Sequence, residues 1–224
     1  MPIVYGIDYE MRWEQGHIPL RFRGKGFDSY EPVHHTGKIA LHQARKFVDN
    51  FGDHYVSKKR RLAGDLPKER SNIGRGIMLS GNNGVRKTTL AAAIATEVQW
   101  LSPAHHVYMT RFSDYKEALT NTFEKEDSIL KQQSKEVLRR CMLSTLLVLD
   151  DIGQEHRTSS GFTESTLHEL VRKRVEAGLP TVVTTNIDPE DMYGIYGKSF
   201  DSFRLEAFQT IEMRGADSRK NYKD

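Results

Sequence analysis

Residues 76–95 read GIMLSGNNGVRKTTLAAAIA, which is the most informative stretch of the chain. Its first five residues are an apolar run of the kind that forms a buried strand, and the next six supply glycines and polar residues for a turn. From Lys87 toward Trp100, alanine, leucine and isoleucine favour a helix. The expected order is therefore strand, glycine-containing loop, helix.

Residues 81–88, GNNGVRKT, match the phosphate-binding (Walker A) pattern G-x-x-x-x-G-K-[ST] at every position but one. Backbone N–H groups of such a loop face the phosphates, its lysine reaches the β- and γ-phosphates, and its hydroxyl binds Mg²⁺. Lys87 and Thr88 fill the last two roles, so we expect ATP and Mg²⁺ as ligands. The candidate nucleotide-binding residues are Gly81, Asn82, Asn83, Gly84, Val85, Arg86, Lys87, Thr88 and Thr89.

Arg86 stands where the pattern has glycine. Glycine is used there because the backbone passes close to the phosphates, often in a conformation that a side chain penalises. Arginine adds bulk and strain of roughly 1–3 kcal/mol, which its charge offsets in part by attracting phosphate. We therefore expect impaired nucleotide binding. The alternative is that the loop only joins a strand to a helix.

A second apolar run, LLVL at residues 146–149, is followed by Asp150 and Asp151. This Walker B pattern delivers an acidic pair to the carboxyl edge of the sheet, where ligands bind in open α/β folds. We expect Asp150 to hold Mg²⁺ through water and Asp151 to orient the attacking water. The alternative is that the two aspartates cap the next helix.

The run TVVTT at residues 181–185 predicts another strand, and Asn186 follows it. A polar side chain at this place is positioned to hydrogen-bond the γ-phosphate or the water that attacks it. Asparagine at the end of a strand is also common in turns, so the assignment of Asn186 depends on its neighbours.

The remaining segments complete an alternation of strands and helices. Continuous apolar strands between helices predict an α/β fold with a parallel sheet covered on both faces, a three-layer αβα arrangement. We expect an irregular arm at residues 1–36, a single ATPase core at 37–224, and a loop in the basic segment that begins at Lys58. The expected helices are 38–55, 87–100 and 163–177, and the charged region 112–138 is expected to be mostly helical. The expected strands are 76–80, 107–109, 146–149, 181–185 and 209–213.

The composition excludes several classes of protein. Cys141 is the only cysteine, so neither an internal disulfide nor a cysteine zinc cluster can form. No apolar run approaches the ~18 residues that span a bilayer, so we expect a cytoplasmic protein with no membrane contact. The net charge is only +3, but basic residues gather at 58–61 and 214–223. Each cluster is a candidate for contact with phosphate groups. The alternative is that each is only a solvated segment of the chain.

Taken together, the motifs resemble replicative helicase loaders of the DnaC type, in the branch of AAA+ ATPases that also holds the IstB transposition helpers. The resemblance runs from Ile18 to Arg219. Besides the Walker A and Walker B motifs, the segments that carry the resemblance are IPLRFR at 18–23, FDSY at 27–30, ARKFV at 44–48, LAAAI at 90–94 and DDIG at 150–153.

The resemblance implies slow ATP hydrolysis as a switch, contact with single-stranded DNA, and a hexameric replicative DNA helicase as partner, with self-association into an oligomer. It assigns Asn186 to sensor 1, Arg219 of GADSR to sensor 2, and Arg204 to a trans-acting arginine finger or, alternatively, a solvated side chain. It also implies no full C-terminal lid domain and a short or missing helicase-gripping segment. The candidate DNA contacts are residues 58–61 and Lys116, Lys125, Lys131 and Lys135.

Other interpretations remain open. An IstB-like transposition helper shares the motifs and would bind duplex DNA and a transposase. A non-hydrolysing adaptor, in which Arg86 has closed the phosphate site, would keep only assembly surfaces. A small-molecule kinase shows no second substrate site in the sequence.

Overall fold

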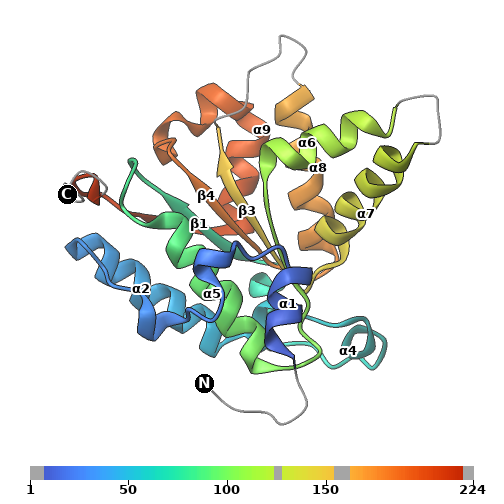
Figure 1. The fold of residues 1–224 in the computed structure, drawn as a ribbon, viewed down its shortest axis with the longest axis horizontal. Helices are drawn as coiled ribbons and strands as arrows, with labels where there is room; N and C mark the ends of the chain where they lie inside the picture. The colour runs from blue at the N-terminus through green and yellow to red at the C-terminus, as the bar shows by residue number, and fades with distance from the viewer. Residues whose placement is uncertain (1–7, 124–127, 154–161, 219–224) are drawn as a thin grey trace.

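The computed structural model describes residues 8–123, 128–153 and 162–218, and the chain there folds around one parallel sheet (Figure 1). The strand order is β2-β3-β4-β1-β5, and all four pairings are parallel. This result confirms the predicted α/β fold. The strands are β1 (Gly76–Ser80), β2 (Val107–Arg111), β3 (Leu146–Ile152), β4 (Thr181–Thr185) and β5 (Phe208–Glu212).

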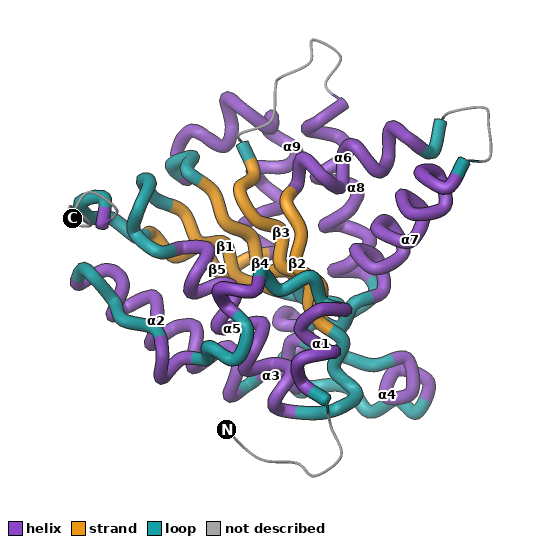
Figure 2. The backbone as a smooth tube through the Cα atoms, viewed as in Figure 1, coloured by secondary structure: helices purple, strands orange, loops and turns teal. Residues whose placement is uncertain are grey.

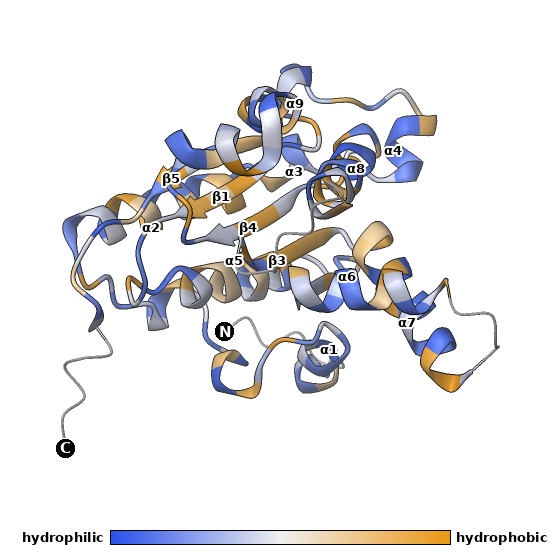
Figure 3. Cartoon of the chain, turned by 90° about the horizontal axis from the view of Figure 1, so that it is seen from above, coloured by the Kyte–Doolittle hydropathy of each residue, from blue (hydrophilic) through white to orange (hydrophobic). Residues whose placement is uncertain are grey.

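Helices cover both faces of the sheet, because successive strand residues point to opposite sides. Ile77 and Leu79 of β1 pack with α2 and α5, whereas Met78 packs with α8 and α9. Figure 3 shows the hydrophobic strands between α5 on one side and α8 and α9 on the other. The α-helices in the described part of the chain are α1 (Tyr9–Gln15), α2 (His35–Asp49), α3 (Phe51–His54), α4 (Lys58–Leu62), α5 (Lys87–Leu101), α6 (Phe112–Asn121), α7 (Ile129–Leu143), α8 (Phe162–Glu176) and α9 (Met192–Ala207).

The N-terminal segment is more ordered than the sequence predicted. Helix α1 begins after Asp8, whose side chain caps it by accepting from the N–H of Met11. Trp13, Ile18 and Phe27 are buried in the same core cluster as α2 and α5. The described part of the predicted arm therefore contains short helices and packs against the rest of the core.

Two further differences concern helices. The basic segment predicted as a loop contains α4, a single turn capped by Ser57. The charged stretch 112–138, predicted to be mostly helical, contains α6 and the first part of α7, which pack against each other (Figure 2). Helix α9 was not predicted, because Gly197 has φ 78° in its middle and interrupts the helical period.

No helix in the described ranges is both long enough and apolar enough to cross a membrane. The polar ends of the strands and the start of α5 together position the candidate site. Because the strands are parallel, Ser80 and Thr185 end at the same edge of the sheet as Asp150.

Candidate nucleotide-binding site

The loop that follows β1 lies at the carboxyl edge of the sheet. Gly81 is tied to the neighbouring strand, since its N–H donates to the carbonyl of Thr185 at 3.2 Å. A Cβ atom at Gly81 would lie 1.9 Å from the carbonyl oxygen of Met213, so a side chain does not fit there. The predicted order of strand, loop and helix is confirmed.

Arg86 has φ 68° and ψ 32°, a left-handed conformation that glycine adopts without penalty. The reason for glycine at this position of the pattern therefore holds in this chain. The guanidinium of Arg86 turns toward the N-terminal segment, where Nη1 donates to the carbonyl of Glu31 at 3.0 Å. The exposed Glu31 carboxylate lies 3.8 Å away and adds a weak ion pair.

Lys87 is the first residue of α5, and its side chain is buried within the loop. The ammonium group donates to the carbonyls of Gly81 at 2.7 Å and Asn82 at 2.8 Å. It also donates to the side-chain oxygen of Asn186 at 2.7 Å. The structure thus brings the predicted phosphate-binding lysine and the predicted sensor residue into contact.

Thr88 and Asp150, the two predicted Mg²⁺ ligands, also meet. The hydroxyl of Thr88 donates to Oδ1 of Asp150 at 2.9 Å. Among the described residues, no group of three or more His, Cys, Asp and Glu side chains gathers as a metal site. Mg²⁺ often takes only one or two protein oxygens and keeps several waters, so the Thr88–Asp150 pair fits this ion.

Thr184 is a residue that the sequence analysis did not assign. Its buried hydroxyl donates to Oδ1 of Asp150 at 2.6 Å and accepts the N–H of Asp151 at 2.9 Å. The Thr184 side chain therefore orients the carboxylate of Asp150 and fixes the backbone of Asp151. The sequence gives no distinct signal for it, because β4 reads TVVTT and β propensity alone explains its threonines.

Asp151 lies at an irregularity of the sheet. The register between β3 and β4 shifts between Leu149 and Ile152, and Asp151 has φ 63°. Asn186 donates from Nδ2 to Oδ1 of Asp151 at 3.3 Å. Lys87, Asn186 and Asp151 therefore form a continuous polar chain across the ends of three strands. The structure thus brings one residue from each Walker motif together with Asn186.

Arg204 is not part of this chain of contacts. Arg204 is only 8% exposed, so it is not the solvated side chain considered as its alternative. Its Nε donates to Asp201 at 2.7 Å and its Nη2 to the carbonyl of Pro189 at 2.9 Å. Its role as a trans-acting finger stays a prediction. Arg219 lies outside the described residues.

The segment at residues 214–218 crosses the phosphate-binding loop. The hydroxyl of Ser218 donates to the carbonyl of Gly84 at 2.6 Å, and Asn82 exchanges two hydrogen bonds with Gly215. The same segment is held by His34, which contacts the carbonyl of Ala216 at 2.8 Å. Sequence reasoning did not predict this contact, which places the start of the GADSR motif directly against the loop.

The candidate DNA lysines lie in different surroundings. Lys116 of α6 donates to the hydroxyl of Thr163 at 2.6 Å, and Lys125 lies outside the described residues. Lys131 and Lys135 are on α7. The basic residues 58–61 form α4, which lies apart from the far end of α7 (Figure 1). These residues do not form a single surface.

Comparisons with known proteins place this geometry in a family. A family model described as IstB-like ATP binding protein matches residues 68–199. The replicative helicase loader DnaC of Escherichia coli K12 is 26% identical over 180 residues, which cover 80% of this chain and 62% of the relative. The replicative helicase loader DnaI of Bacillus subtilis is 30% identical over 119 residues, covering 53% of this chain and 35% of the relative.

The fold is similar to that in a crystal structure of the DnaC helicase loader. The TM-score is 0.66 at 22% sequence identity, and the match covers 87% of this chain and 99% of that chain. The chain spans about three fifths of the length of the curated DnaC relative that it matches. These matches confirm the resemblance that the sequence motifs indicated.

Proposed function

Because the chain belongs to the family of IstB-like ATP binding proteins, we propose that it is an ATP-dependent loader of a hexameric replicative DNA helicase. The observation that carries this proposal is the polar chain at the carboxyl edge of the sheet. It joins Lys87 to Asn186 and Asp151, beside the Thr88–Asp150 pair. The helicase is proposed as partner because the DnaC and DnaI relatives are replicative helicase loaders.

In this proposal, each residue of the site has one task. Lys87 binds the β- and γ-phosphates of ATP with its ammonium group. Thr88 and Asp150 hold Mg²⁺, which supplies charge neutralisation at the phosphates when it is bound. Asp151 orients the attacking water and accepts its proton, and Asn186 hydrogen-bonds the γ-phosphate or that water.

In this proposal, Arg86 slows the ATP hydrolysis that acts as a switch but does not abolish it. A left-handed arginine before α5 costs backbone strain, and its guanidinium is held at Glu31 instead of being buried in the loop. The polar contacts of Lys87, Thr88 and Asp150 are nevertheless intact, which supports a working nucleotide site over a purely structural loop.

We propose that single-stranded DNA contacts the α6–α7 pair. Lys131 and Lys135 lie on α7, and the aromatic side chain of Phe123, just after α6, is 70% exposed. Lysines that meet phosphates beside an exposed aromatic ring that stacks on bases are the features that single-strand binding uses. Self-association would place Arg204, from one copy, near the nucleotide of the next.

One experiment tests the central proposal. The chain is mixed with a purified hexameric replicative helicase, with an ATP analogue and Mg²⁺, and complex formation is followed by size-exclusion chromatography with light scattering. We expect a complex that depends on nucleotide in the parent and is lost in Lys87→Ala. A complex that forms equally with Lys87→Ala would favour the adaptor.

A salt series tests the DNA proposal. Affinity for single strands should fall steeply with salt, and each lysine removed should reduce the slope of log K against log[salt] by ~0.7. The Lys131→Ala and Lys135→Ala pair is compared with Lys173→Ala on α8, whose ammonium is paired with Glu169. An unchanged slope in the α7 pair contradicts the proposal.

A transposition helper is the second candidate, because the matching family model is named for the IstB-like proteins. Such a protein would bind duplex DNA and a transposase. Preference for duplex over single strands in the same salt series, together with failure to bind the helicase, would favour it.

A further inference from the structure

The segment at residues 214–218, called the strap below, brings a carboxylate to the phosphate-binding loop. The strap begins just after β5, where the N–H of Met213 donates to the carbonyl of Ser80 at 2.7 Å. A Cβ atom at Gly84 would lie 1.7 Å from Oδ1 of Asp217, so the Asp217 carboxylate touches the backbone of the loop. The site described above gives Asp217 no task, and its charge has the same sign as that of the phosphates.

Hydrogen bonds on either side of Asp217 hold the strap to the loop. Ser218 donates to the carbonyl of Gly84 from its hydroxyl at 2.6 Å and from its N–H at 3.3 Å. Two residues before Asp217, the N–H of Gly215 donates to Oδ1 of Asn82 at 3.3 Å. The backbone that carries the Asp217 carboxylate is therefore fixed against the loop.

The residues at the start of α2 hold the strap as well. The hydroxyl of Thr36 donates to the carbonyl of Arg214 at 2.7 Å and accepts the N–H of the same residue at 3.0 Å. Nε2 of His34 donates to the carbonyl of Ala216 at 2.8 Å. A Cβ atom at Gly215 would lie 1.9 Å from the His34 ring, so the two segments are in close contact. The strap is thus held by the N-terminal segment and by the loop together.

We propose that the strap is an autoinhibitory contact, in which Asp217 weakens the binding of nucleotide phosphates to the loop. The inference rests on the nucleotide site of the proposed function. Backbone N–H groups of the loop and the ammonium of Lys87 attract phosphates, whereas a carboxylate against Gly84 repels them. The hydrogen bonds that hold the strap also hold this negative charge at the loop, so loosening the strap strengthens ATP binding.

Asp217→Asn tests the inference, because it removes the charge and keeps the size of the side chain. ATP and adenosine each displace a fluorescent ATP analogue from the full chain in the presence of Mg²⁺. We expect ATP to bind about 3- to 10-fold more tightly to the variant, and adenosine, which has no phosphate, to bind equally to both. The difference for ATP should shrink at about 1 M salt, which screens exposed charges. Asp49→Asn makes the same change at the exposed end of α2 and should bind as the parent does.

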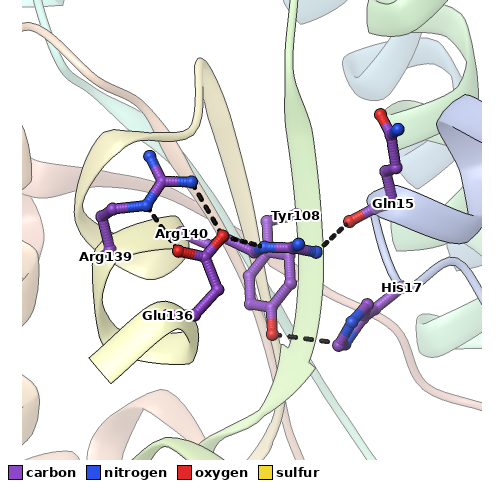
Figure 4. A network of polar contacts seen from close by, with 6 residues as sticks. All are labelled: Gln15, His17, Tyr108, Glu136, Arg139 and Arg140. Carbon is purple, nitrogen blue, oxygen red and sulfur yellow. Dashed lines mark hydrogen bonds and ion pairs between the residues drawn. The ribbon is translucent and has the colours of Figure 1, made fainter. Parts of the chain in front are cut away.

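A second variant loosens the strap without changing the loop or its charge. Thr36→Val keeps the shape of the side chain but removes both hydrogen bonds to Arg214, so ATP should bind about twofold or more tightly. Arg140→Met is the matched control. Arg140 holds another part of the N-terminal segment by donating to the carbonyl of Gln15 at 2.8 Å (Figure 4). It lies over Tyr108 of β2, at the opposite edge of the sheet from β5, so its loss should leave ATP affinity unchanged.

The outcomes separate this inference from the proposed function. Equal or weaker ATP binding in Asp217→Asn, with binding still lost in Lys87→Ala, overturns the autoinhibitory contact and leaves the nucleotide site in place. Tightening of the same size for adenosine also overturns it, because the effect then comes from the shape of the loop and not from charge. If neither the parent nor Asp217→Asn binds ATP, the inference and the proposed function both fail. Circular dichroism verifies that each variant is folded.

Discussion

Two turns beside the candidate nucleotide site each hold a non-glycine residue in the left-handed backbone conformation, but the two side chains carry opposite charges. Arg86, before α5, has φ 68°, and Asp151, at the end of β3, has φ 63°. Arg86 leaves the site to contact Glu31, whereas Asp151 stays within it and accepts from Asn186. Residues other than glycine in the left-handed conformation often occur at functional sites. Whether the side chain points into the site or away from it decides whether the residue takes part in that site. Only at Asp151 does the residue in the left-handed conformation keep its side chain within the candidate site.

Asp151→Asn should have the largest effect. The carboxylate acts on water and not on the nucleotide, so hydrolysis should fall about 100-fold or more while ATP affinity stays within about threefold. Asparagine tolerates the left-handed conformation, so the turn is kept. Steady-state turnover and a titration with a labelled ATP analogue measure the two effects. Turnover equal to that of the parent would remove Asp151 from the mechanism, and Asp150→Asn, which should also disturb Mg²⁺, is the companion variant.

Thr184→Val should come next, because it removes the hydroxyl that joins the two aspartates. The loss of two hydrogen bonds near charged groups is expected to lower turnover about tenfold and to raise the Mg²⁺ concentration needed for half-maximal rate. Thr184→Ser keeps the hydroxyl and should restore both values. If valine and serine variants behave alike, Thr184 only fills space in β4.

Arg86→Gly and Asp151→Gly compare the two turns directly. Each removes a side chain from a left-handed position, so each should raise the free energy of unfolding by ~0.5–1 kcal/mol, as measured by urea denaturation. Arg86→Gly should also strengthen ATP binding severalfold, whereas Asp151→Gly should lower hydrolysis about as far as Asp151→Asn does. Weaker ATP binding in Arg86→Gly would show that the arginine is adapted to its site.

Glu31→Gln should have the smallest effect. The Glu31 side chain is 88% exposed, and its carboxylate lies 3.8 Å from Arg86, so the ion pair contributes little. The carbonyl that accepts from Arg86 belongs to the backbone and is unchanged. We expect the free energy of unfolding to change by less than ~0.5 kcal/mol in the same denaturation assay. A larger loss would mean that the N-terminal segment is held to the loop by charge.

Local pattern was enough to predict the strands and the two motifs. Continuous apolar runs such as 146–149 predict strands well because these strands are buried on both faces of the sheet. The spacing of the two motifs from their strands places Lys87 and Asp150 at the same edge of the sheet. The contact between Thr88 and Asp150 follows from that placement. Short or interrupted helices were not readable: α1 has only two turns, and Gly197 breaks the period of α9.

The missed parts of the site depend on contacts between distant residues. Thr184 joins the two aspartates because the register shift after Leu149 brings the N–H of Asp151 to the hydroxyl that also donates to Asp150. The segment at 214–218 lies on the loop through bonds to Asn82 and Gly84, more than a hundred residues earlier in the chain. The direction of the Arg86 side chain depends on the packing of the N-terminal segment. None of these is encoded in a local period or motif.

The strand order has a consequence for the growing chain on the ribosome. Among the described strands, β1 pairs only with β4 and β5, and β4 begins about 100 residues after β1 ends. At ~5–20 residues per second, the apolar β1 is therefore synthesised roughly 5–20 s before β4, the first of its neighbours. During that interval neither edge of β1 has its native partner, so the strand that leads into the phosphate loop joins the sheet late.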